Sequence, residues 1–282
     1  MADMTDRTDQ GFDYLPRAAA GVGAAFARPK WIAGACVVAL TALGWLALAL
    51  MTAANNDVFA AVCRPDTGAL TASSVAITAL MWAAMVLAMM LPSAAPMILT
   101  YAEIADTAAR KNETIVSPLT LAAGYTVIWL GFAALATVAQ LALSGAALLD
   151  SGIAASSDLF AGAIFIAAGL YQFSALKHAC LRQCQNPFPF FFTNWATTPR
   201  GVFRLGVEQG LFCLGCCWAM MLVMFAVGVM NIVWMAGLGI VMTAEKMGTG
   251  KWFTHAVGVA LLLAGAGFVL SGFAAHWPGH GI

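Results

Sequence analysis

Long apolar runs constrain the fold of this chain more than any other feature. Seven stretches are apolar and long enough, or nearly long enough, to cross a bilayer as helices. They cover residues 31–51, 76–101, 119–143, 158–178, 207–229, 232–247 and 254–273. Of the 282 residues, 62% are hydrophobic and 9% are charged, whereas about 25% are charged in soluble domains. The sequence therefore predicts an all-α, polytopic transmembrane helical bundle with about seven spans.

The segments around these runs predict two tails. Residues 1–30 have several charged and few large apolar side chains, so we expect a disordered cytoplasmic N-terminal tail. Residues 31–273 form the predicted transmembrane domain, and residues 274–282 form a short outer C-terminal tail. The run at 232–247 is short for a full crossing, and a re-entrant segment there would move the C-terminus to the other side.

The basic residues predict the orientation. With seven spans and a cytoplasmic N-terminus, twelve of the 13 Lys and Arg residues fall in cytoplasmic segments, and Arg64 falls outside. The positive-inside rule expects this asymmetry of a correct topology. We therefore predict that the N-terminus is inside.

The run at 207–229 carries a stripe of sulfur side chains. At about 100° per residue, its cysteines and two of its methionines share a helix face roughly 100° wide and about 16 Å long. These residues are Cys213, Cys216, Cys217, Met220 and Met224. Thiolates and thioethers are the ligands that select Cu(I), and thiolates also suit zinc and iron–sulfur centres. Both residue types also fill apolar cores, but three cysteines within five residues favour a metal site.

A second pair of cysteines follows the fourth run. Cys180 and Cys184 are four residues apart, so both thiols face one side if the helix continues to Gln185. His178 would point about 160° away from Cys180, which makes it a poor co-ligand. A structural histidine at a helix C-terminus is the better interpretation of His178.

The topology brings the two cysteine groups together. The fourth and fifth runs are antiparallel neighbours joined on the cytoplasmic side, so we expect one site in the inner half of the membrane. A dipping loop could close the remaining gap between the groups. The cytoplasmic side is reducing, which favours free thiolates or metal ligation over disulfides.

The second run has a further sulfur-rich face. Met81, Met85 and Met89 step by four residues, and they could either form a thioether ladder for a soft cation or pack on neighbouring helices. Pro92 and Pro96 follow in the same run and should kink its helix.

Two other segments have simpler interpretations. Glu245 and Lys246 could belong to a proton relay, but charges at the membrane interface explain them more simply. The longest cytoplasmic loop, at about 179–206, contains Pro187 and Pro189, which argue against a continuous helix. Its aromatic residues suit a segment that lies on the inner face of the membrane or dips into it.

Enzyme and nucleic-acid signatures are absent from the sequence. It has no Walker loop, dinucleotide fingerprint, HExxH motif or nucleophile elbow. The formal net charge is zero, which offers no attraction for nucleic acids. The expected partners are the lipid bilayer and other membrane protein subunits, and catalysis is not indicated.

Three segments carry a resemblance to a known family. They read WAAMVLAMMLPSAAPM, YQFSALKHACLRQCQNP and GLFCLGCCWAMMLVMFAVGVMNIVWM, followed by a Glu-Lys pair. With its CxxxC and CxxCC motifs, the stretch from Trp82 to Lys246 resembles a bacterial family described as predicted metal-binding integral membrane proteins of unknown function. The resemblance implies a bacterial inner membrane.

The leading hypothesis is a multi-pass protein that binds a soft metal ion for handling, delivery or transport. Copper(I) is favoured and zinc is possible. The predicted ligands are Cys180, Cys184, Cys213, Cys216 and Cys217, extended outward by Met220 and Met224. The alternatives are a non-catalytic structural or assembly subunit of a larger membrane complex and a transmembrane thiol–disulfide redox protein.

The charge asymmetry predicts where reporter fusions will appear. A fusion after Leu149 is expected outside the cell membrane and a fusion after Thr198 inside, because basic loops stay in the cytoplasm. The measurement is a pair of reporters, one active on each side. A C-terminal fusion that reads as cytoplasmic would contradict the seven-span count and make the run at 232–247 re-entrant.

Overall fold

The computed structural model describes residues 29–53, 72–111, 114–150, 153–229 and 231–276. Most of the two predicted tails, at residues 1–28 and 277–282, lies outside the described residues. Within the described ranges the chain forms nine helices and no β-sheet, which confirms the all-α prediction. The helices are α2 (Pro29–Ala53), α4 (Ala72–Arg110), α5 (Pro118–Gly145), α6 (Asp158–Gln172), α7 (Ala175–Gln185), α8 (Pro187–Thr193), α9 (Pro199–Val227), α10 (Ile232–Lys246) and α11 (Lys251–His276).

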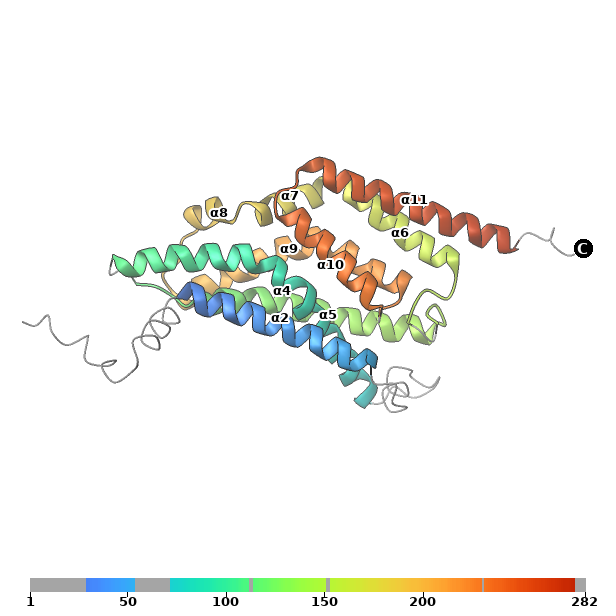
Figure 1. Ribbon diagram of the computed structural model, residues 1–282, viewed down its shortest axis with the longest axis horizontal. Coiled ribbons are helices and arrows are strands. Elements are labelled where there is room, and N and C mark those ends of the chain that lie inside the picture. The colour runs from blue at the N-terminus through green and yellow to red at the C-terminus, as the bar shows by residue number, and fades with distance from the viewer. Residues whose placement is uncertain (1–28, 54–71, 112–113, 151–152, 230, 277–282) are drawn as a thin grey trace, which may run out of the picture.

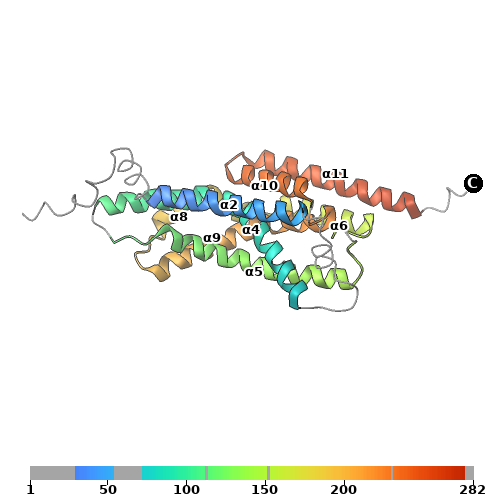
Figure 2. The same ribbon diagram turned by 60° about the horizontal axis from the view of Figure 1, so that its bottom comes forward.

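The helices form an elongated bundle in which α9 is central. Helix α2 packs along α4, α5 packs along α9, and α6 packs along α11 (Figures 1 and 2). Helix α9 contacts α5, α6, α7 and α10. The start of α2 lies toward the end of the long axis opposite to the end of α11 (Figure 1). Side chains on α9 can therefore meet side chains from several other helices.

Polar caps define where many of the helices begin. The side chains of five residues each accept a hydrogen bond from a backbone N–H in the first turn of the following helix. These residues are Ser117, Ser157, Ser174, Thr198 and Asn231. Each cap satisfies one of the N–H groups that a helix start leaves without an internal partner.

Five helices are long and apolar enough to cross a membrane, or six if α6 and α7 together form one broken span. The predicted count of about seven is close, and it differs at two places. The fourth predicted run breaks between Gln172 and Ala175, where the axis bends by 64° and Ser174 caps a new helix. Helix α10 has 15 residues, which is about 22 Å, shorter than an apolar layer of about 30 Å.

Helix α4 continues through its two internal prolines, Pro92 and Pro96, and changes direction along its length (Figure 2). Because Pro92 has no N–H, the Ala88 carbonyl four residues earlier loses its usual donor. The Trp45 indole N–H of α2 donates to this carbonyl at 3.1 Å. The predicted kink is present, and a neighbouring helix satisfies a carbonyl that it frees.

The predicted loop at about 179–206 is partly helical. As the prolines indicate, the helix is not continuous: α7 ends at Gln185 and α8 begins at Pro187. Phe191 of α8 is fully buried, and its ring lies edge-on to Tyr101 of α4 at 5.4 Å between centroids. The segment therefore packs on the C-terminal part of α4.

Glycines allow α5 and α9 to approach each other closely. A Cβ placed on Gly124 would overlap the Phe203 carbonyl oxygen, and a Cβ on Gly206 would overlap the Leu121 carbonyl oxygen. Small residues at such crossings let helix backbones pack directly against each other.

This crossing predicts a difference between two glycines of the same helix. Gly124→Ala should lower the free energy of unfolding by about 1–3 kcal/mol, because the methyl group forces α5 away from α9. Gly131→Ala is the matched control, since its Cβ would meet no atom of the described chain within 4 Å. Melting in detergent measures both variants, and equal stability of the two would contradict the close crossing.

Candidate metal centre

The sulfur stripe of α9 faces the interior of the bundle. Cys213, Cys216, Cys217, Met220 and Met224 are all buried, with exposed fractions between 0% and 2%. Their shared face is the one predicted from helical spacing. It points toward the neighbouring helices.

Helix α7 adds a thiol to this face. The Cys184 Sγ lies 3.9 Å from the Cys216 Sγ, and the Cys216 Sγ lies 3.3 Å from the Cys217 Sγ. The Cys216 thiol also donates to the Cys213 carbonyl at 3.1 Å. The Cys213 thiol also interacts with the thiols of Cys184, Cys216 and Cys217. Four of the five predicted thiols, which we call the thiol cluster, therefore come together from two helices.

The fifth predicted thiol, Cys180, lies beside the cluster. It is half-buried, and its Sγ would be 2.6 Å from a Cβ placed on Gly215 of α9. The missing side chain at Gly215 thus provides the space that Cys180 occupies. The Gly215 carbonyl also accepts a hydrogen bond from the Tyr171 hydroxyl, which holds α6 against α9 at this level.

The two methionines continue the stripe away from the thiols. The Gln172 side-chain amide of α6 donates to the Met220 Sδ at 2.9 Å, and both residues are buried. Met224 is completely buried one turn further along α9. The first thioether therefore has a polar neighbour, and the second lies in the apolar core.

Two polar residues contact Cys213, and a third holds one of them. The Tyr125 hydroxyl of α5 donates to the Met90 carbonyl at 3.0 Å and lies 3.0 Å from the Cys213 Sγ. The Lys246 ammonium of α10 donates to the Cys213 Sγ at 2.9 Å and to the Ser93 hydroxyl at 2.7 Å. The sequence analysis did not find Tyr125 or Ser93, because neither belongs to a motif.

The interfacial interpretation of Glu245 and Lys246 is wrong. Glu245 is 2% exposed and Lys246 is 6% exposed, because α10 ends within the bundle. The Glu245 Oε2 accepts a hydrogen bond from the Nζ of Lys177, which is also buried, at 2.8 Å. An ionisable pair inside a long apolar segment was the signal that could have predicted buried, paired positions for these residues.

The same burial alters the count of basic residues. Lys177 and Lys246 are inside the bundle and are not loop charges, so ten of the twelve predicted cytoplasmic residues remain against Arg64. Lys and Arg residues are therefore still in excess in the predicted cytoplasmic segments.

His178 is also placed differently from the prediction. It lies in the first turn of α7 and not at a helix C-terminus, because the fourth run breaks before it. Its Nε2 lies 3.3 Å from the Nε2 of His255 in α11. His178 thus contacts a histidine of another helix and not the cysteines.

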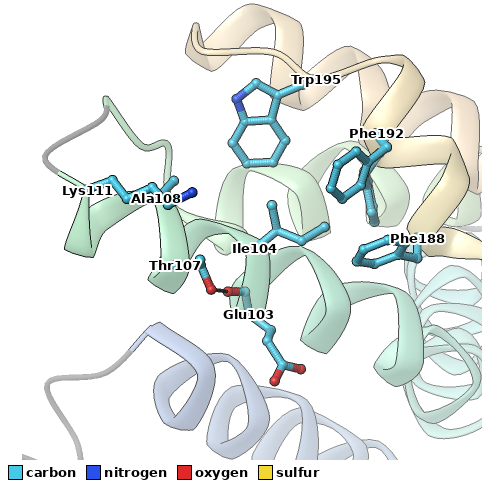
Figure 3. Close-up of a pocket in the computed structure, with 9 residues that line it drawn as sticks. Glu103, Ile104, Thr107, Ala108, Lys111, Phe188, Phe192 and Trp195 are labelled. Atoms are coloured by element: carbon cyan, nitrogen blue, oxygen red, sulfur yellow. Dashed lines mark hydrogen bonds between the residues drawn. The ribbon is translucent and has the colours of Figure 1, made fainter.

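A cavity of about 400 Å³ lies elsewhere, between α4 and α8. The rings of Phe188, Phe192 and Trp195 gather around Ile104, while the Glu103 carboxylate points away (Figure 3). None of the nine residues that line this cavity has a sulfur atom. The cavity is therefore separate from the thiol cluster.

The spacing of the thiols suits a shared soft metal ion. Two sulfurs bound to one ion at about 2.3 Å each are at most about 4.6 Å apart. The separations of 3.9 Å for Cys184–Cys216 and 3.3 Å for Cys216–Cys217 are below this limit. Within the described ranges, no three His, Cys, Asp or Glu side chains already converge on one point as ligands would. The cluster thus offers close pairs of thiols.

Mild oxidation tests this placement. A variant that keeps only Cys184 and Cys216 should form an intramolecular disulfide, because the structure brings their thiols to 3.9 Å. A variant that keeps only Cys36 and Cys216 is the control, since Cys36 of α2 lines a groove with residues of α4 and α5. Mass spectrometry after oxidation reads out both. Failure of the first pair to crosslink in folded protein would contradict the cluster.

Comparison with known proteins bears on what the cluster binds. No match is found among curated proteins or among solved structures. Residues 79–268 match the model of a family described as PpoB2, copper chaperone. This stretch begins within α4, ends within α11 and contains the whole thiol cluster. Because it covers more than half of the 282 residues, the chain belongs to the PpoB2 family of copper chaperones.

Proposed function

We propose that this protein binds Cu(I) in the thiol cluster as cargo and passes it to another protein. One observation carries the proposal: a half-buried thiol of α7 and a buried thiol of α9 approach within 3.9 Å in a copper-chaperone family member. Thiolates are preferred ligands of Cu(I). Zinc remains the second candidate, because it also binds thiolates.

The surroundings of the cluster suit a reduced copper ion. Cys213, Cys216 and Cys217 are at most 2% exposed, so neighbouring side chains exclude water. Met220 and Met224 provide further soft ligands on the same helix face. A dry, sulfur-rich site favours the softer monovalent ion over Cu(II), which prefers nitrogen and oxygen ligands.

Cys180 gives an incoming ion a first contact. It is half-buried and lies one helical turn before Cys184 on α7. An ion bound there can exchange ligands stepwise with Cys184 and then with Cys216. In this proposal Cys180 acts in transfer, and a pair of the cluster thiols holds the ion.

The same burial disfavours the thiol–disulfide alternative. Redox-active cysteines need an accessible thiolate to attack a partner disulfide. Three of the four cluster thiols are buried inside α9. A structural subunit without metal is the other alternative, and metal measurement separates it from the copper proposal.

The proposed location is a bacterial inner membrane with a cytoplasmic N-terminus. Five or six apolar spans and the excess of basic residues in the predicted cytoplasmic segments support it. In that orientation the thiol cluster receives copper on the reducing side.

Substitution of single cysteines tests the proposal. Cys216→Ser should weaken Cu(I) binding by more than about tenfold, because a hydroxyl is a poor ligand for a soft ion. Cys36→Ser is the control. Cys36 is also half-buried, but it lines a groove of α2, α4 and α5 and does not belong to the thiol cluster. The full chain is purified in detergent under reducing conditions, and Cu(I) affinity is measured by competition with a chelator.

Melting temperature in the same detergent shows whether each variant is folded. Wild-type protein that takes up neither copper nor zinc would overturn the proposal and favour the structural subunit. Unchanged Cu(I) affinity in the Ser variants of Cys184, Cys213, Cys216 and Cys217 would place the copper site elsewhere.

A further inference from the structure

Lys246 brings a positive charge to the thiol cluster. Its Nζ lies 2.9 Å from the Cys213 Sγ and 2.7 Å from the Ser93 Oγ, inside the bundle. An ammonium group is strongly hydrated in water, so burying it is costly unless a negative charge is close by. Its charge therefore needs a partner within the site.

The adjacent carboxylate is already paired with another lysine. Glu245 accepts a hydrogen bond from Lys177 at 2.8 Å, and that pair is 2% and 0% exposed. Successive residues on a helix point about 100° apart, so Glu245 and Lys246 face different neighbours. Of the two groups that accept hydrogen bonds from Lys246, the Cys213 sulfur is the one that becomes an anion when it binds a metal.

We propose that Lys246 makes the thiol cluster selective for a monovalent soft cation over a divalent one. This inference rests on the proposed function, since it concerns which ion the same thiols retain. The ammonium stays charged and does not bind the ion. It balances the charge of the complex that the ion forms with the thiolates.

Formal charges show how the selection works. A monovalent ion held by two thiolates carries one negative charge, which the ammonium cancels. A divalent ion with two thiolates is neutral, so the ammonium leaves the site positive, and with four thiolates one negative charge remains. Three thiolates with a neutral fourth ligand would balance a divalent ion, but within the described ranges the thiols approach in pairs and no three of them converge on one point. In a low-dielectric interior an uncompensated charge is costly, so the monovalent complex is preferred.

The contacts of Lys246 support a fixed position for this charge. Ser93 also donates to the Met90 carbonyl at 2.8 Å, so its hydroxyl oxygen is oriented toward the ammonium. Lys246 ends α10, where the helix dipole favours a cation. The charge is thus held beside Cys213 by groups from α4 and α9.

The test compares Cu(I) and Zn(II) affinities of the full chain in detergent, each by chelator competition. Lys246→Met should lower the ratio of Cu(I) to Zn(II) affinity by at least about tenfold, as removal of a group next to the ligands typically does. Lys246→Gln, which keeps a hydrogen-bond donor without the charge, should give the same loss. Lys246→Arg should keep the ratio within about threefold, because it retains the charge.

A charge-neutral double variant is the matched control. Lys177→Met with Glu245→Gln removes the neighbouring buried ion pair together, and its affinity ratio should match that of wild type. Equal loss of Cu(I) and Zn(II) affinity in Lys246→Gln, or no loss, would overturn the inference while leaving copper binding intact. Wild-type protein that binds neither ion would instead overturn the proposed function.

Discussion

The structure depends on a small group of hydrogen bonds around Cys213. Lys246 joins α10 to Cys213 of α9 and to Ser93 of α4. Tyr125 joins α5 to Cys213 and to the Met90 carbonyl of α4. Four helices thus meet through polar contacts at one level of an otherwise apolar bundle. In such surroundings each polar group needs an internal partner, so these contacts fix the positions of the helices as well as the thiol.

The prolines of α4 contribute to this arrangement. Pro92 removes the donor for the Ala88 carbonyl, and Trp45 supplies another from α2. Close to the same break, the Met90 carbonyl accepts hydrogen bonds from Ser93 and Tyr125. In a regular helix, backbone N–H groups would donate to these carbonyls, and side-chain donors would not be required. The irregular part of α4 therefore connects α2 and α5 to the helix that carries the cysteines.

Most of the fold followed from local sequence patterns. The apolar runs predicted the long helices, and the spacing of the cysteines predicted the buried face of α9. The convergence of Cys184 with that face followed from two neighbouring antiparallel runs that are joined on one side. These features depend on periodicity and chain order, which one sequence shows directly.

The rest depended on hydrogen bonds and packing contacts that hydropathy does not show. Ser174 caps a new helix, and this local hydrogen bond divides the fourth run where hydropathy shows no break. Tyr125 reaches Cys213 because α5 packs on α9, and Ser93 reaches Lys246 because α10 packs on α4. The depth of Glu245 and Lys246 depended on α10 ending after 15 residues within the bundle. Hydropathy cannot show which partner a charge will find.

The length of α10 explains how two opposite charges occupy the interior. A longer helix would carry Glu245 and Lys246 out to the end of the bundle, where water would solvate them. Because α10 ends after 15 residues, its last turn lies beside α7 on one side and beside α4 and α9 on the other. Glu245 therefore meets Lys177, and Lys246 meets Cys213 and Ser93. The pair of Glu245 and Lys177 is electrically neutral. The positive charge of Lys246 therefore remains available to balance negative charge on the thiol that Lys246 contacts.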